Sequence, residues 1–278
     1  MGALLAFAAL ASWTFADLFT KHALSKQSLW FVSFWAQLLG GAGLLLLGLL
    51  LGRIHAIPIE SWPWVALFSV INIFGMFFFY KSVQQKGVAL SLPIIYSWSL
   101  PTIVLSMIFL NQYPSPLQWF GVGTIIIGLF CISLDRKNKH WIDRGTFFAF
   151  FSMLIWGVFY FLVSGPSELY GEWWLSGSLK VGTAVLSLPF LFHEQKGLVF
   201  KRDKIFWVVG LIGLFDAFGL VALSTALQLS SAAVATGITS TAPAAIALLG
   251  VFLFKEKVNR QQGFGIAATV GGILLLVI

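Results

Sequence analysis

Ten apolar segments, each about twenty residues long and separated by short polar breaks, occupy almost the whole chain. At a rise of about 1.5 Å per residue, a helix of this length crosses a hydrocarbon core about 30 Å thick. In lipid, backbone groups must be satisfied within helices or closed barrels, and these segments are too long and too uniformly apolar for barrel strands. The sequence therefore predicts an all-α integral membrane protein with ten transmembrane helices. The predicted spans are residues 2–20, 30–51, 62–80, 88–110, 116–134, 145–164, 173–192, 205–224, 231–254 and 261–278.

The seventeen Lys and Arg residues predict how these spans are oriented. Alternate loops hold fifteen of them, whereas the other loops hold only Arg53 together with three glutamates. Short loops rich in Lys and Arg stay in the cytoplasm, so we expect a multi-pass protein of a bacterial-type inner membrane with both termini outside. The net charge of +7 follows these loops, and nucleic acid is not an expected partner. The cytoplasmic set is Lys21, Lys26, Lys81, Lys86, Arg136, Lys137, Lys139, Arg144, Lys196, Lys201, Arg202, Lys204, Lys255, Lys257 and Arg260.

The two halves of the chain resemble each other. A shift of 143 places Trp13 on Trp156 and Trp30 on Trp173, and after one deleted position a shift of 142 places Pro101 on Pro243. Each half has five predicted spans, an odd number, so the second half must enter the membrane from the opposite side. The sequence therefore predicts an inverted-topology repeat, residues 1–141 and 142–278, within one membrane domain. This architecture is typical of secondary transporters that bind their substrate between the repeats.

At this point the chain resembles the drug/metabolite transporter (DMT) superfamily, specifically its EamA-like ten-span exporters. The stretch Tyr80 to Ser82, followed by Gly87 to Pro101, is similar to that family's stretch before a mid-span proline. In the second half, Ala226 to Pro243, then Phe254 to Glu256 and Gly263, matches better. The resemblance covers the whole chain and implies a transporter in which the fifth and tenth spans lie at the periphery, where a homodimer contact is expected.

Two charged residues inside predicted spans are the first candidates for the substrate site. Lys180 and Asp216 lie at similar depths in spans seven and eight, and an unpaired charge there costs several kcal/mol. Their first-half counterparts are Gln37 and, within a residue, Asn72. In one interpretation Lys180 receives an anionic group of the substrate, while Asp216 holds Lys180 or carries a coupling proton. In the other, the two residues form a structural ion pair.

A third charged residue inside a predicted span is Asp17, four residues before Lys21 in span one. An acid and a base at this spacing face each other on a helix. We therefore expect Asp17 to be structural.

Polar and aromatic residues on spans four and nine are the second set of candidates. Ser97, Trp98 and Pro101 share one face of span four, and Thr239, Ser240 and Pro243 share the matching face of span nine. We expect Pro101 and Pro243 to act as hinges. Trp98 could stack on an aromatic or cationic solute, and the other deep tryptophans are Trp13 and Trp156. The alternative is that these small residues serve only helix packing.

No residue pattern predicts catalysis, a cofactor or a metal site. The four histidines lie at loops or span ends, and none has ligand spacing to another histidine or to Cys131, the sole cysteine. There is no Walker-type phosphate loop. The glycines of spans five and ten, Gly121, Gly123, Gly263, Gly265 and the pair at 271–272, are interpreted as packing surfaces.

The function expected from these features is secondary-active transport by alternating access. The expected substrates are small polar metabolites such as amino acids or organic anions, and the expected direction is export. The alternative within transport is a carrier of organic cations or drugs, in which Asp216 and the aromatic residues bind positive charge and Lys180 is structural. The alternatives outside transport are a non-transporting membrane scaffold and an integral membrane enzyme.

Overall fold

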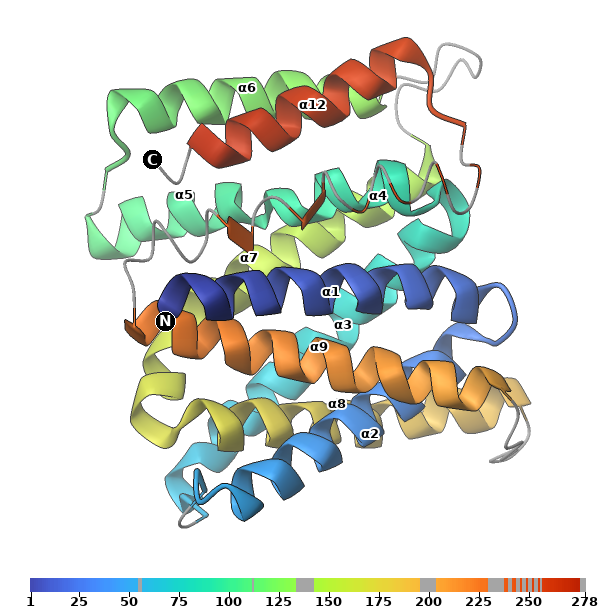
Figure 1. Cartoon of the computed structure of the whole chain (residues 1–278), viewed down its shortest axis with the longest axis vertical. Coiled ribbons are helices and arrows are strands. Elements are labelled where there is room, and N and C mark those ends of the chain that lie inside the picture. Colours follow the sequence, from blue (N-terminus) through green and yellow to red (C-terminus); the bar gives the residue numbers. More distant parts are fainter. Residues whose placement is uncertain are drawn as a thin grey trace.

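In a computed structural model the chain forms a bundle of long helices that lie roughly side by side (Figure 1). The structure describes residues 1–54, 57–111, 113–133, 143–195, 204–229 and 257–275, with isolated positions between 238 and 255. Most of the predicted ninth span lies outside these residues. The described elements are α1 Gly2–Leu24, α2 Leu29–Leu50, η1 Ile59–Ser61, α3 Trp62–Lys86, α4 Val88–Ile95, η2 Tyr96–Trp98, α5 Ser99–Leu110, α6 Pro116–Ser133, α7 Arg144–Tyr170, α8 Glu172–Gln195, α9 Lys204–Leu229 and α12 Arg260–Leu275.

Local sequence signals mark the ends of several helices. The Ser28 side chain accepts a hydrogen bond from the Phe31 backbone at the start of α2, and Asp143 does the same for Thr146 at the start of α7. Both residues are favoured N-caps because their oxygens satisfy a free backbone N–H. At the other end, α3 stops at Gly87 and α7 at Gly171, which have φ of 81° and 86°, a conformation that glycine adopts without strain.

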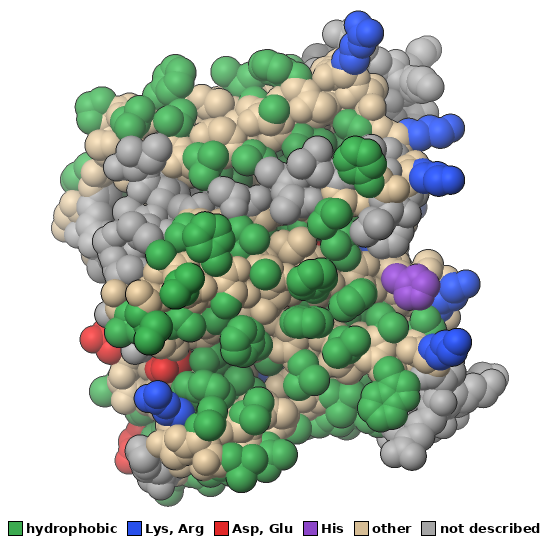
Figure 2. Space-filling model, viewed as in Figure 1, with side chains coloured by type: hydrophobic (Ala, Val, Ile, Leu, Met, Phe, Trp, Pro, Cys, Tyr) green, Lys and Arg blue, Asp and Glu red, His purple; other side chains and the backbone are tan. Residues whose placement is uncertain are grey.

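The chain is an all-α, multi-pass membrane protein. In the described part of the chain, seven helical segments are long and apolar enough to cross a membrane, and Pro116–Ile132 is a shorter apolar helix. The total of ten spans remains a prediction. Figure 2 shows most Lys and Arg side chains along one edge of the molecule, Asp and Glu near the opposite edge beside a basic side chain, and apolar side chains between the two edges. We call these edges the basic end, which includes Lys21, Lys26 and Lys86, and the acidic end.

Helix packing follows the repeat. α1 packs along α9, and its counterpart α7 packs along α3. α2 packs along α8 and α6 along α12, so each of these counterpart pairs meets its own copy. This pattern is expected when two similar five-helix units are related by a twofold axis through the α2–α8 and α6–α12 contacts.

Glycines allow two helix pairs to approach closely. A Cβ added at Gly213 of α9 would lie 2.0 Å from the Ala36 carbonyl oxygen of α2. On the peripheral pair, a Cβ at Gly121 of α6 would lie 2.8 Å from the Gly272 carbonyl oxygen of α12. These backbones touch because neither glycine has a side chain, as is common between membrane helices.

Only some of the other glycines of α6 and α12 follow this pattern. Gly128 and Gly265 also pack against the partner helix, whereas Gly123, Gly263 and Gly271 have no atom within 4 Å of an added Cβ. The sequence alignment that places Gly121 on Gly263 therefore pairs a buried contact with an open position. Packing, not identity, sets the register of these last two helices.

The fourth span is interrupted in its middle. α4 ends at Ile95 and α5 begins at Ser99, and the 3₁₀ turn η2 joins them. Pro101 cannot donate to the Ser97 carbonyl because proline lacks an N–H. One residue later, the Thr102 hydroxyl lies 3.0 Å from the Trp98 carbonyl oxygen and 3.0 Å from the Gly157 carbonyl oxygen of α7, and it can donate its proton to either. The predicted hinge at Pro101 therefore lies beside a break in the helix.

An ion pair fastens the start of α7 to the end of α3. Lys86 Nζ lies 2.9 Å from Asp143 Oδ2 and also contacts the Thr146 hydroxyl. Partial burial opposes ionisation of Asp143, but hydrogen bonds from the Thr146 backbone and from Lys86 outweigh it and lower the pKa of the carboxyl below its ordinary value. This contact joins the two halves at the basic end.

We expect Gly213→Ala to lower the free energy of unfolding by about 1–3 kcal/mol, because the added methyl overlaps the Ala36 carbonyl. Gly210→Ala, one turn away on the same helix, is the matched control. Its added Cβ would meet only Leu39 Cδ1, at 3.4 Å, and the helix gains propensity. Thermal unfolding of the purified protein, followed by tryptophan fluorescence, measures both variants. Equal stability of the two would contradict the close contact.

A carboxyl with a lowered pKa stabilises the fold above its ordinary pKa and loses this contribution as the pH falls through the folded-state value. We therefore expect wild type to lose stability relative to Asp143→Asn as the solution is acidified below the ordinary range of an aspartate. The difference should be at most about 1 kcal/mol because the Asp143 side chain is 37% exposed. Thermal unfolding across pH checks this expectation, and parallel pH profiles would refute it.

Candidate functional site

A small cavity lies in the middle of the bundle, among helices of both halves. It holds about 80 Å³ of space, enough for several waters or a small part of a ligand. We call it the aromatic cavity because most of its wall is aromatic. Its lining residues are Trp13 and Asp17 of α1, Met76 and Phe79 of α3, Ile95 of α4, Tyr96 and Trp98 of η2, Trp156 and Tyr160 of α7, and Asp216 of α9.

The aromatic rings of the cavity pack on one another. The ring centroids of Trp98 and Tyr160 are 4.3 Å apart, and those of Trp156 and Tyr160 are 6.0 Å apart. A Cβ at Gly219 would lie 2.6 Å from Trp13 Nε1, so Trp13 packs directly on α9. Rings held in place by their neighbours present fixed π-faces, which attract cations and stack on aromatic groups.

Lys180 and Asp216 form an ion pair between α8 and α9. Lys180 Nζ donates to Asp216 Oδ2 at 2.5 Å. The Lys180 side chain is 3% exposed and that of Asp216 is 21% exposed. Asp216 borders the aromatic cavity, whereas Lys180 is not part of its lining. The carboxylate therefore faces the cavity and the ammonium group lies behind it.

The amide counterparts of this pair join the same network. Gln37 Nε2 donates to Asp216 Oδ2 at 3.4 Å, and Asn72 Nδ2 donates to Gln37 Oε1 at 3.1 Å. Asn72 also donates to the Thr183 hydroxyl at 2.9 Å. Gln37 and Asn72 are 1% and 2% exposed and are not among the described residues that line the cavity. Both are connected to the cavity through the hydrogen bond from Gln37 to Asp216.

A second carboxylate, Asp17, borders the cavity from α1. Its Oδ2 accepts a hydrogen bond from the Tyr96 hydroxyl at 2.9 Å. α1 and α9 run antiparallel and touch at Trp13 and Gly219. Asp17 is four residues beyond this contact on α1, and Asp216 is three residues before it on α9. At helical rise both carboxylates therefore lie about one turn closer to the basic end, at the same depth.

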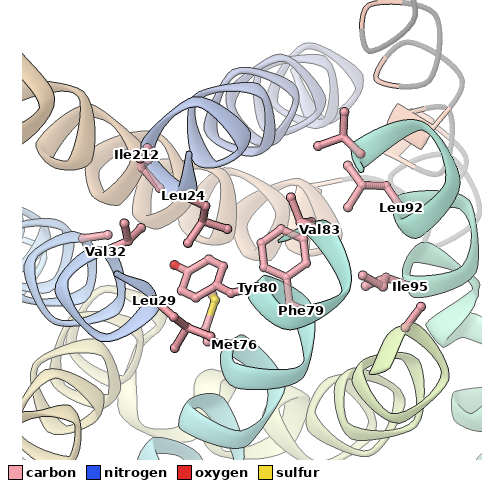
Figure 3. Close-up of a cluster of buried hydrophobic side chains, with 14 of the residues drawn as sticks. Leu24, Leu29, Val32, Met76, Phe79, Tyr80, Val83, Leu92, Ile95 and Ile212 are labelled. Carbon is pink, nitrogen blue, oxygen red and sulfur yellow. The ribbon is translucent and has the colours of Figure 1, made fainter. Parts of the chain in front are cut away.

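An apolar cluster separates the cavity from the basic end. Figure 3 shows Tyr80 among Leu24, Leu29 and Val32, with Phe79 beside Ile95. Phe79 and Ile95 line the cavity as well, and Leu24 is the last residue of α1. The side chains of this cluster are buried and mostly apolar, so they disfavour water between the cavity and the basic end.

A second concave region is chemically different. An apolar groove of about 440 Å³ lies between α3 and α8 and is lined by residues such as Trp62, Val65, Val70, Val181 and Val185. It has no charged lining residue. Carboxylates and hydroxyl groups meet in the aromatic cavity, which is therefore the better candidate for binding a polar solute.

The structure places the other expected site residues in three ways. Trp13, Trp98 and Trp156 line the cavity. Ser97 does not, because it is buried and its hydroxyl donates to the Pro93 carbonyl at 2.8 Å. Thr239 and Pro243 are buried and lie at helical positions, and neither is among the described residues that line the cavity. Ser240 lies outside the described residues.

Asp17, Tyr96 and Tyr160 were not expected at the site. The spacing between Asp17 and Lys21 favours a structural pair on one helix and gives no sign of the cavity beside Asp17. The shift of 143 that aligns Trp13 with Trp156 also aligns Asp17 with Tyr160. Trp13 and Trp156 are candidate site residues, and Asp17 and Tyr160 lie one helical turn beyond them on the same faces. This placement could have identified Asp17 and Tyr160 as candidates from the sequence.

Comparisons with known proteins agree with this architecture. The EamA-like transporter family matches residues 1–134 and again residues 143–278. A Bacillus subtilis (strain 168) protein described as the uncharacterized transporter YwfM is 23% identical over 275 residues, which are 97% of this chain and 92% of that protein. A solved crystal structure superposes with a TM-score of 0.72 at 17% identity, covering 99% of this chain and 94% of the other. At that identity the superposition supports the fold alone.

Repeated helical units around a cavity within a membrane are typical of small-molecule transporters. The chain belongs to the EamA-like transporter family, and membership of the drug/metabolite transporter superfamily fits it. Its partners accordingly include a lipid bilayer and a small-molecule substrate.

We expect Lys180→Met to lower the free energy of unfolding by about 3–5 kcal/mol, because it leaves the Asp216 carboxylate without its cation inside the bundle. Adding Asp216→Asn should recover most of this loss, since the double variant has no unpaired charge. Thermal unfolding of the wild type, both single variants and the double variant gives the coupling energy. Additive effects would show that the two residues are energetically independent.

Proposed function

We propose that the protein is a secondary transporter of small organic cations that carry an aromatic or apolar body. One observation supports this most strongly: the described residues that border the aromatic cavity include two carboxylates, Asp17 and Asp216, and no Lys or Arg. An ammonium group beside a carboxylate and over the face of Trp98 or Trp156 would be stabilised by both.

The position of Lys180 favours one of the two substrate classes that the sequence leaves open. An anionic group would have to reach an ammonium group that is 3% exposed and already bound to Asp216. It would also pass the carboxylate face of the cavity, which repels it. A cation meets Asp216 first, and Lys180 then serves to hold that carboxylate in place. The geometry therefore favours the organic-cation carrier over a carrier of organic anions.

Alternating access fits two features of the structure, the apolar cluster on one side of the cavity and the interrupted fourth span. The apolar cluster closes the cavity toward the basic end, and span four, which supplies Tyr96 and Trp98, is interrupted at the cavity. We propose that this span moves about Pro101, with Pro243 in the corresponding role, and that the basic end faces the cytoplasm of an inner membrane. Release at the opposite end makes the protein an exporter.

Three ligands with one carbon skeleton and different charges test the substrate class. These are 2-phenylethylamine, phenylalanine and 3-phenylpropionate, which are a cation, a zwitterion and an anion. We expect the amine to bind most tightly, and at one hundred times its Kd to stabilise the fold by about 2.7 kcal/mol. Calorimetric titration of the purified protein measures the three affinities. Tightest binding of 3-phenylpropionate would refute the proposal.

Variants locate the site of binding. Trp98→Ala should weaken binding of the amine by about 0.5–2 kcal/mol through loss of the cation–π contact. The double variant Lys180→Met with Asp216→Asn should weaken it while the fold persists. Glu60→Gln is the control, because Glu60 is an exposed carboxylate outside the cavity. Amine flux into liposomes that contain the protein distinguishes a transporter from a non-transporting scaffold or a membrane enzyme.

A further inference from the structure

We propose that the apolar groove between α3 and α8 binds one acyl chain of a phospholipid from the membrane leaflet at the acidic end. The described residues that line this groove are all different from those that line the aromatic cavity. The groove would therefore be a lipid site, separate from the site proposed for the solute.

The groove opens on the outside of the bundle, where the protein contacts lipid. Its rim carries the exposed side chains of Trp62, Val70 and Val185, whereas Val65 and Ser69 on its floor are buried. α3 and α8 both belong to segments that are long and apolar enough to cross a membrane. Apolar side chains exposed on the outside of such a segment contact hydrocarbon chains. The molecules that surround the groove are therefore lipids.

Both helices of the groove begin at the acidic end, side by side. Glu60 lies just before α3 and Glu172 is the first residue of α8. Trp174 Nε1 of α8 donates to the Ser61 hydroxyl at 2.8 Å, and the rings of Trp62 and Trp174 meet edge to face with their centroids 5.9 Å apart. Tryptophan rings are enriched at the level of the lipid headgroups. One end of the groove therefore lies where the acyl chains of this leaflet begin.

The length of the groove matches the depth of one leaflet. Its lining runs from Trp62 to Val70 on α3 and from Trp174 to Leu186 on α8. At helical rise these stretches are about 12 Å and about 18 Å long. Half of a hydrocarbon core is about 15 Å thick. A chain that enters at the two tryptophans and follows the groove therefore reaches the middle of the membrane, as the acyl chain of a phospholipid does.

The chemistry of the wall also suits such a chain. The groove holds about 440 Å³, and its described lining is apolar except for Ser69 and Ser178. The Ser69 hydroxyl lies 2.7 Å from the Val65 carbonyl oxygen and 3.0 Å from that of Leu179. The buried Ser178 hydroxyl has no hydrogen-bond partner among the described residues, although buried polar groups are normally paired. Ser178 lies one turn below Trp174, at the level where an ester carbonyl begins an acyl chain and can accept its proton.

The floor of the groove adjoins the network that holds Asp216. Gly182 packs so closely on α3 that an added Cβ would overlap the Ser69 hydroxyl. The next residue, Thr183, accepts a hydrogen bond from Asn72 at 2.9 Å, and Asn72 is connected to Asp216 through the network. A chain in the groove would cover this network on the side of the membrane. We therefore expect the bound lipid to stabilise the fold.

Photochemical labelling of the full-length protein tests the proposal. The protein is reconstituted into vesicles of dioleoylphosphatidylcholine that contain a small fraction of phosphatidylcholine with a diazirine on one acyl chain. After illumination, mass spectrometry locates the labelled residues. We expect severalfold more label at Ala66, Val70 and Val185 than at Ile127 of α6 and Val158 of α7, which are also exposed on the bundle but do not line the groove. Label spread evenly over these positions, or missing from the groove because a second copy of the chain covers it, would overturn the proposal.

A pair of matched variants gives a second measurement. Ala66→Phe places a ring in the groove from an exposed position, and Ala11→Phe makes the same change at an exposed position of α1 that is not among the described lining residues. Native mass spectrometry after mild detergent extraction should find one phospholipid retained by wild type and by Ala11→Phe, and lost from Ala66→Phe. Adding dioleoylphosphatidylcholine to delipidated protein should raise the melting temperature of the first two and not of the third. Equal lipid retention and equal stabilisation in Ala66→Phe would show that the groove is not the site.

Discussion

The ion pair between Lys180 and Asp216 is the contact on which the centre of the molecule depends. A membrane interior tolerates such charges only when they satisfy each other, so α8 and α9 must hold the pair at one depth. Gln37 and Asn72 extend it to α2 and α3. Four helices, two from each half, are therefore joined by one buried hydrogen-bonded network that ends at the cavity.

The same network shows how similar halves come to have different roles. Lys180 and Asp216 correspond to Gln37 and Asn72, so one half supplies charges and the other supplies amides at the same level. If both halves carried a Lys–Asp pair at this level, four charged groups would lie close together in the middle of the bundle. One charged pair, supported by neutral donors and acceptors, leaves a single carboxylate of the network facing the cavity. Shape is thus repeated between the halves, whereas charge is not.

The all-α membrane architecture followed from the sequence because span length and the distribution of Lys and Arg are set by the bilayer. The depth of Lys180 and Asp216 could also be predicted, since position along a helix fixes depth. Whether Lys180 faced the cavity could not, because rotation of a helix about its axis depends on its neighbours. The same limit concealed Asp17, whose spacing to Lys21 describes one helix and not the tertiary contact with Tyr96. The interruption of the helix at Tyr96 lies within a continuous apolar stretch, and the prolines of that stretch are its only signal in the sequence.

The contact between Gly213 and Ala36 has a mechanical consequence. Where backbones touch without side chains between them, one helix cannot slide along the other without driving a larger residue into a carbonyl group. We therefore expect α2 and α9 to move as one unit, so that any displacement is taken up by other helices. This unit carries Asp216, whose carboxylate would stay at one depth while the other walls of the cavity move. A solute would be passed from one side to the other past a stationary charge.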